Sequence, residues 1–364
     1  MEQRLVPKQD KTISLFEQSI KSQYTRRVYV TCLKIYFEFP GSRKLIHSTD
    51  TRKIEDHITD FITSMKKQGK SFGAIQNYIS PIIIYYRTKR ASLDTKHIHG
   101  YLPEFRKSKK DRAYTYDEIH RLLDIADERM RVIILLLAST GMRVGAIPEL
   151  RLRNIEVVES EYGKIYKITI YEGFKEEYIS FTTPECSTAI DNYLAMRSRY
   201  GENFSPNSFL IREQFDIRDQ FDVLKCKQVK ANTISRQLID LAERSGIRKK
   251  EAEVLKENKK RAEIRKDVPI AHGFRKFFSS KLVEADLKTE LRWLLEGHNL
   301  KGNDPAYVRT TEKHLQEEYE KAIDNLTIDP ANRLRRTVET LKIEKSKIDM
   351  LEAKIQKLER RHRR

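Results

Sequence analysis

The stretch from Arg131 to Ser139 is almost wholly apolar, and it limits the folds open to this chain more than any other segment. Its centre, Val132 to Ala138, is the longest apolar run in the sequence and is far too short to span a bilayer. The segment therefore predicts a buried helix that leads to Thr140-Gly141. Upstream, Thr115-Tyr116-Asp117-Glu118 has the capping-box pattern, which predicts the start of an earlier helix in the same domain.

Three short runs after this buried helix have the composition of β-strands. They cover Ile155 to Val158, Lys164 to Tyr171, and Glu177 to Phe181. Further helices are predicted from Thr183-Pro184 to about Arg199 and from Ala231 to Ser245, with Pro184 at a permitted first-turn position. The sequence thus predicts a mainly α fold with a small β-sheet, an α+β domain. Residues 248–266 are dense with charges of both signs and predict an exposed insertion, to which no role is assigned.

The N-terminal part predicts a separate helical domain over residues 10–95. Apolar residues recur there at roughly helical spacing in two segments: Phe16, Ile20, Tyr24, Val28, Val30, Leu33, Tyr36 and Phe37, then Ile54, Ile58, Phe61 and Ile62. A third apolar segment runs from Ile75 to Tyr86, and Pro81 is expected to kink or split it. A basic linker is predicted over residues 96–112, which either lies along phosphates or is simply solvated.

The charge balance indicates the kind of partner. A formal net charge of +18 and a pI near 9.6 predict a polyanionic partner. The three cysteines, Cys32, Cys186 and Cys226, are isolated, which argues against a disulfide framework and fits a reducing compartment. The polar N-terminus, Met1-Glu2-Gln3-Arg4, does not have the apolar region of a signal peptide. We therefore expect a cytoplasmic, nucleoid-associated protein that binds nucleic acid and not a membrane.

Six residues spread along the chain can together hold and attack a phosphodiester. They are Arg143, Lys175, His272, Arg275, His298 and Tyr307. Attack on phosphorus builds negative charge on the non-bridging oxygens, and the planar fork of arginine can hold two such oxygens. His272 and Arg275 are three residues apart, so on a helix they share one face. Phosphate-loop, dinucleotide and His-Glu-x-x-His patterns are absent from the sequence, so neither a cofactor nor a metal is expected.

The order of these motifs resembles that of the tyrosine recombinases, the phage-integrase family that cuts and rejoins DNA. The resemblance rests on Ser139-Thr140-Gly141-Met142-Arg143, Ala271-His272-Gly273-Phe274-Arg275, Gly297-His298 and Tyr307. It implies that Tyr307 is the nucleophile of a covalent 3′-phosphotyrosine, with His272 as its base and Lys175 as the acid for the leaving oxygen. Arg143 and Arg275 are then the phosphate clamps, and His298 donates a hydrogen bond to a non-bridging oxygen.

The resemblance also implies an organisation and partners. It covers about residues 113–328 as the catalytic domain, and it makes the N-terminal domain a core-binding domain that closes a clamp around DNA. The implied partners are double-stranded DNA attachment sites and further copies of the chain, in a tetramer on DNA. A virus or mobile element in a prokaryotic host is the natural source. Two departures stand out, because Ala146 occupies a place where the family often has Glu, and Glu296 replaces part of an apolar lead-in to Gly297-His298.

A second tyrosine, Tyr319, also lies beyond His298 and competes with Tyr307 as nucleophile. Tyr319 falls on a stripe at helical spacing that is typical of a core: Leu315, Tyr319, Ala322, Ile323 and Leu326. Tyr307 follows the Gly302-Asn303-Asp304-Pro305 turn and stands nine residues after His298, a spacing typical of the family. The sequence therefore favours Tyr307.

Two other functions remain open at this point. A type IB topoisomerase-like enzyme uses the same chemistry to relax supercoils without pairing two sites. A non-catalytic architectural protein that binds DNA could keep the fold without the reaction. The separate N-terminal domain favours a recombinase over the former, and the complete set of six residues favours an enzyme over the latter.

The last segment, residues 331–364, predicts a basic coiled-coil-like tail. Leu334, Leu341, Ile348 and Ile355 recur every seven residues, and Leu351 and Leu358 fill the companion positions of the last two heptads. Thr337 and Glu344 weaken the earlier companion positions. One interpretation is a helix packed back on its own domain, or a basic helix that touches DNA. The other is a coiled coil between protomers.

Overall fold

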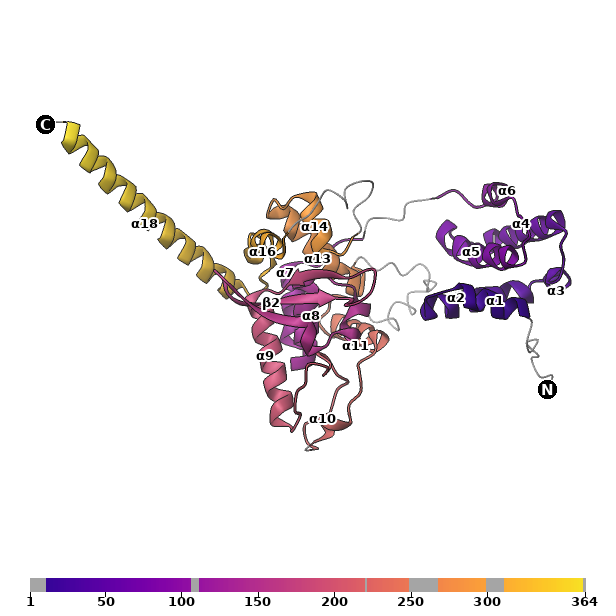
Figure 1. Ribbon diagram of the computed structural model, residues 1–364, viewed down its shortest axis with the longest axis horizontal. Coiled ribbons are helices and arrows are strands. Elements are labelled where there is room, and N and C mark those ends of the chain that lie inside the picture. Colours follow the sequence, from indigo (N-terminus) through magenta and orange to yellow (C-terminus); the bar gives the residue numbers. More distant parts are fainter. Residues whose placement is uncertain (1–10, 106–110, 220, 249–267, 299–310, 363–364) are drawn as a thin grey trace. The chain divides into compact units, whose positions relative to one another are not determined.

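The computed structural model describes residues 11–105, 111–219, 221–248, 268–298 and 311–362, and they form two compact units (Figure 1). The first unit is Met1–Lys109 and the second is Lys110–Arg364. Helices dominate both units, and the second also contains a small sheet, so the predicted fold class is confirmed. In the described part of the chain, no helix is both long and apolar enough to cross a membrane.

The first unit is a bundle of helices around an aromatic and aliphatic core. Its helices are α1 (Lys11–Ser19), α2 (Gln23–Glu38), α3 (Ser42–Leu45), α4 (Thr51–Lys67), α5 (Phe72–Thr88) and α6 (Thr95–Gly100). The side chains of Ser22, Asp50 and Ser71 cap α2, α4 and α5, and so satisfy backbone N–H groups that have no partner within the helix. Helix α5 runs unbroken through Pro81, so the expected split does not occur.

The end of the first unit differs from the sequence prediction. The linker was predicted from residue 96, but Thr95–Gly100 forms helix α6, and Ile98 is fully buried in the core of this unit. Asp94 caps the helix by accepting from the backbone N–H groups of Lys96 and His97. A single apolar residue among basic neighbours gives too weak a periodic signal to reveal such a short helix.

The second unit begins with α7 (Tyr116–Asp124), whose capping box of Thr115 and Glu118 is confirmed, and α8 (Glu128–Thr140). Two 3-10 turns, η1 (Val144–Glu149) and η2 (Leu152–Asn154), lead into the sheet. The later helices are α9 (Pro184–Arg199), α10 (Asp222–Lys225), α11 (Ala231–Arg244), α13 (Ile270–Glu284), α14 (Thr289–Leu295), α16 (Glu312–Glu320), α17 (Ile323–Leu326) and α18 (Pro330–His362). Helices α9 and α11 match the predicted segments closely.

The sheet is an antiparallel meander of three strands in the order β1-β2-β3. The strands are β1 (Ile155–Ser160), β2 (Gly163–Ile170) and β3 (Tyr178–Phe181), close to the three predicted runs. Ile155 pairs with Ile168, and Lys167 pairs with Phe181. The loop that connects β2 to β3 carries Lys175, and it leaves the sheet at the end of β2.

Helix α8 is the centre of the second unit, as its apolar sequence predicts. All residues from Val132 to Thr140 are buried, because α8 contacts α7, α9, α13 and β3. The helix ends at Gly141, which adopts a left-handed backbone conformation with φ of 61°. A Cβ atom at this position would lie 2.3 Å from the ring of Phe278, so helix α13 approaches α8 closely only because residue 141 is glycine.

We predict that Gly141→Ala lowers the free energy of unfolding by roughly 3 kcal/mol, from backbone strain and the clash with Phe278. Gly145→Ala is the matched control, because a Cβ at Gly145 meets nothing within 4 Å and its φ is not positive. The control should change stability by less than about 1 kcal/mol. Urea unfolding of both variants measures the difference, and equal midpoints would contradict this account of the α8–α13 contact.

Candidate active site

Arg275 is the buried centre of the candidate site. It lies on α13 and exposes 6% of its surface. Its Nη1 donates to the carbonyl of Gly141 at 2.8 Å, and its Nη2 donates to the carbonyl of Glu296 at 2.5 Å. Nη2 also lies 2.9 Å from Nε2 of His298. One guanidinium thus joins the end of α8, helix α13 and the turn after α14, because its donors form a rigid fork that reaches all three.

His298 is held between two charged residues. Its Nε2 faces Arg275, which can only donate, and its Nδ1 lies 3.1 Å from Oε2 of Glu296. Neutral His298 therefore carries its proton on Nδ1, toward the carboxylate. Burial lowers the pKa of His298, and the charge of Arg275 lowers it further, while Glu296 opposes the shift. Glu296 thus orients the imidazole.

Arg143 follows Gly141 and Met142 directly, at the start of η1, and it is exposed. Its charge influences the pKa values of His272 and His298, so the guanidinium lies in the same electrostatic neighbourhood as Arg275. Within the described part of the chain, the Arg143 side chain makes no hydrogen bond or ion pair. Arg143 therefore offers its donors outward, whereas Arg275 uses donors to hold the site together.

His272 lies on α13 one turn before Arg275 and is exposed. Partial burial of its imidazole lowers its pKa, and the charges of Lys276 and Arg275 lower it further, while Asp111 opposes the shift. Lys276 is itself anchored by Asp111, with Nζ 3.0 Å from Oδ1. His272 is therefore neutral at pH 7, which is the form that accepts a proton.

Two tyrosines connect the loop that carries Lys175 to the arginines. Tyr171 begins this loop in a left-handed conformation, with φ of 59°, a strained state that tends to occur at functional sites. Burial raises the pKa of Tyr171, and the charges of Arg143 and Arg275 oppose the shift. Burial also raises the pKa of Tyr178 to about 12, again against the charge of Arg275. Lys175 itself is exposed between these anchors, and no described contact joins it to the arginines.

Tyr178 also sets the position of His298. A Cβ on Gly297 would lie 2.4 Å from the ring of Tyr178, and Gly297 has φ of 64°. The turn that carries His298 thus packs directly on strand β3. Sequence reasoning missed Tyr171 and Tyr178, although both flank the Lys175 hairpin. The only available signal was their position at the ends of two predicted strands, since tyrosine is common in strands for other reasons.

Of the two candidate nucleophiles, Tyr307 and Tyr319, the structure describes only Tyr319. Tyr307 lies outside the described residues, so its assignment stays a prediction. Tyr319 is fully buried on α16, and its hydroxyl donates to the carbonyl of Ser139 at 2.9 Å. Its ring lies 5.5 Å from that of Phe181. Tyr319 is therefore a core residue, as its helical stripe indicates.

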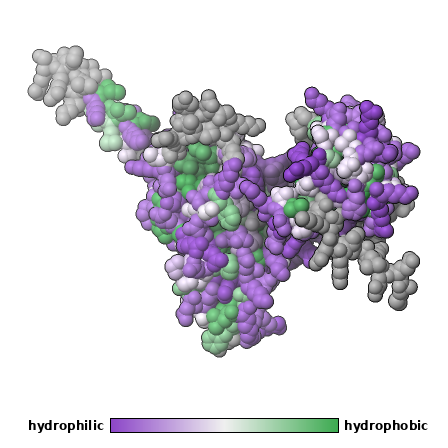
Figure 2. Space-filling model, turned by 45° about the vertical axis from the view of Figure 1, so that its right-hand side comes forward, coloured by the Kyte–Doolittle hydropathy of each residue, from purple (hydrophilic) through white to green (hydrophobic). Residues whose placement is uncertain are grey.

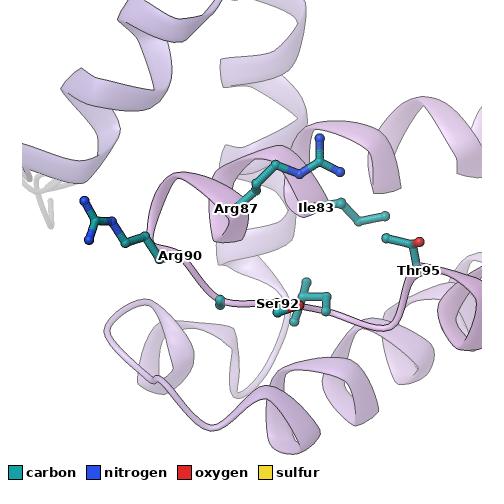
Figure 3. A pocket seen from close by; sticks show the side chains of 7 residues that line it. Ile83, Arg87, Arg90, Ser92 and Thr95 are labelled. Atoms are coloured by element: carbon teal, nitrogen blue, oxygen red, sulfur yellow. The ribbon is translucent and has the colours of Figure 1, made fainter.

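A pocket of about 350 Å³ lies in the first unit, beside the loop between α5 and α6 (Figure 3). Its lining includes Arg87 and Arg90, and Arg90 extends away from the other labelled side chains. None of the five predicted catalytic residues that the structure describes lines it. The candidate active site lies instead in the second unit, where it consists of Arg143, His272, Arg275 and His298.

We predict that Arg275→Lys lowers the free energy of unfolding by about 3 kcal/mol, because a lysine cannot reach both carbonyls and leaves buried groups unpaired. Arg143→Lys should leave the urea midpoint unchanged, since Arg143 is exposed. The comparison separates a structural arginine from one that serves only the substrate. A midpoint for Arg275→Lys equal to that of the parent would refute the role of Arg275 in joining the three segments.

Comparison with known proteins shows which family this chain is similar to. The model of the phage integrase family matches residues 112–314. Tyrosine recombinase XerA of Pyrococcus furiosus is 24% identical over 271 residues, which cover 73% of this chain and 80% of the relative. This membership confirms the predicted enzyme class, a tyrosine site-specific recombinase, and does not favour the topoisomerase or architectural alternatives.

Solved structures agree on the fold. XerH recombinase bound to difH substrate matches with a TM-score of 0.52 and 16% identity, over 84% of this chain and 83% of that one. A lambda integrase dimer on a COC′ core site matches with a TM-score of 0.51 and 15% identity, over 85% of this chain and 95% of that one. With a family model that spans more than half of its length, this chain belongs to the phage integrase family of tyrosine recombinases.

Proposed function

We propose that this protein cleaves and rejoins duplex DNA at specific attachment sites through a covalent bond between Tyr307 and the 3′-phosphate. The observation that carries the proposal is the placement of four residues. Arg143, His272 and His298 are exposed beside the buried Arg275, in a region whose charges act on one another. This arrangement makes a cationic surface backed by a rigid support, as phosphodiester chemistry requires.

The proposed reaction uses the six predicted residues in fixed roles. The phenolic oxygen of Tyr307 attacks phosphorus as its proton passes to the neutral His272, and the bond from phosphorus to the 5′-oxygen breaks. Lys175, on its exposed loop, protonates that leaving oxygen. Arg143 and Arg275 neutralise the charge that develops on the non-bridging oxygens. His298 donates a hydrogen bond to one of them, which requires that Nε2 carry a proton in the DNA complex. The reverse steps rejoin the strand, and because the phosphotyrosine bond conserves the energy, ATP is not needed.

Assembly on DNA forms the second part of the proposal. Relatives of similar fold are bound to DNA in their solved structures, among them a lambda integrase tetramer on a Holliday junction, which matches with a TM-score of 0.52. By analogy, this chain acts as a tetramer on two attachment sites, with the helical N-terminal unit closing on the duplex. A net charge of +18 favours binding to DNA, which is a polyanion.

The nucleophile can be tested with nicked duplexes taken from the DNA that flanks the gene. A nick near the scissile bond lets the leaving fragment diffuse away, so the covalent adduct accumulates on a denaturing gel. Tyr307→Phe should bind DNA and form no adduct. Tyr319→Phe should still form it and lose about 1 kcal/mol of stability with the bond to Ser139. An adduct in Tyr307→Phe that is absent from Tyr319→Phe would reverse the assignment.

The base can be tested by the pH dependence of cleavage at low DNA concentration, which reports the free enzyme. The neutral form of His272 is active and persists above its pKa, which lies below the ordinary value of about 6.5. The rate should therefore fall toward acid pH with a midpoint below pH 6.5. His272→Gln should remove this acidic limb. A midpoint at or above pH 6.5, or a limb that survives in His272→Gln, would contradict the role of His272.

A further inference from the structure

Helix α18 presents an apolar stripe that its own domain does not cover. It spans Pro330–His362 and is the longest helix described. Leu334, Leu341, Ile348 and Ile355 expose 67%, 58%, 55% and 54% of their surfaces, and Leu351 exposes 58%. In Figure 2 the described part of this helix shows hydrophobic residues between hydrophilic ones. Exposure of this kind along a regular repeat marks an interaction surface.

The repeat of this stripe is a heptad. Leu334, Leu341, Ile348 and Ile355 take the first core position, a, and Leu351 takes the second, d. A strict seven-residue repeat lies along one seam of two helices that supercoil around each other. Isoleucine at a with leucine at d, as in Ile348, Leu351 and Ile355, favours two strands.

We propose that α18 pairs in parallel and in register with α18 of a second copy of this chain, as a two-stranded coiled coil that forms without DNA. The flanking charges support both the partner and the orientation. Lys347 takes position g and Glu352 takes position e of the next heptad, five residues later. In a parallel pair, these positions meet across the interface, so Lys347 of each copy faces Glu352 of the other.

An antiparallel pair places like charges together. There, position g meets g, so Lys347 and Lys354 face basic residues, whereas position e meets e, where Glu352 can face Lys345. Like charges at the g positions repel, which favours the parallel pair over this arrangement. The sequence continues the parallel register with Leu358 at d and Glu359 five residues after Lys354.

One described residue opposes the pairing and so provides a sharp test. Glu344 takes a d position, where it meets the same residue of the second copy. Glu344→Leu should tighten self-association about tenfold or more, because it removes a like-charge pair and buries two leucines. Asp349→Leu is the matched control, since Asp349 takes outward position b and the change in charge and apolar area is similar. Sedimentation of the full chain without DNA measures both.

Two results would overturn the proposal. One is a parent protein that stays monomeric at every concentration, together with an unchanged Glu344→Leu variant. The other is equal tightening by Glu344→Leu and Asp349→Leu, since that would show nonspecific apolar association. Adduct formation on a single site is measured in parallel, so a failure of the catalytic proposal is seen separately.

Charge reversal tests the orientation and distinguishes a second copy from DNA. Glu352→Lys alone should weaken the dimer, because Lys347 then faces a lysine, and the double variant Lys347→Glu, Glu352→Lys should restore it. A helix that contacts DNA predicts something else: Glu352→Lys would raise DNA affinity, and the double variant would restore no dimer. That second result would show that α18 contacts DNA and does not form a coiled coil.

A cross-link tests the register. In a parallel dimer, Leu351→Cys places two thiols face to face, and Ala353→Cys, at outward position f, does not. Both variants also carry Cys226→Ser, because Cys226 is partly exposed and could cross-link by itself. Cys32 and Cys186 are buried and are left unchanged. A reducible dimer from Leu351→Cys alone is expected. Equal cross-linking at both positions, or none at either, would refute the parallel register.

Discussion

The hydrogen bonds of the Arg275 guanidinium are the interaction on which the second unit depends most. A buried cation is costly unless its donors are satisfied, and here two backbone carbonyls and an imidazole satisfy them. Those acceptors come from the end of α8 and from the turn after α14. The same bonds that stabilise the charge therefore bring distant parts of the chain together, and they hold His298 beside the position from which Arg143 extends outward.

The close contacts around this centre make it rigid. Gly141 admits the ring of Phe278, and Gly297 admits the ring of Tyr178, so helices and sheet approach without intervening side chains. Burial, together with the accumulated positive charge, lowers the pKa values of both histidines and favours their neutral forms. A site of this kind binds an anion with donors that are already oriented, and reorganisation then costs little during the reaction.

Relatives of similar fold share few identical residues with this chain. In this chain, the carboxylate of Glu296 lies beside Nδ1 of His298. A charge in this place changes which nitrogen of the imidazole holds the proton. Helix α18 exposes an apolar stripe, and its proposed pairing uses none of the residues of the catalytic centre.

The sequence alone determined α7, α8, α9, α11 and the three strands of the second unit, because the apolar run of α8, the strand-like composition of three short runs and the Thr115 cap are local signals. It did not reveal η1, η2, α10 or α14. It also indicated His272, Arg275, Arg143 and His298, because their order is distinctive. Only the tertiary structure decided that Arg275 is a buried support, whereas Arg143 is open, since both are simply arginines in the sequence. Likewise, Ile98 and Tyr178 acquire their roles from contacts with residues far away in the chain, and no local pattern encodes such contacts.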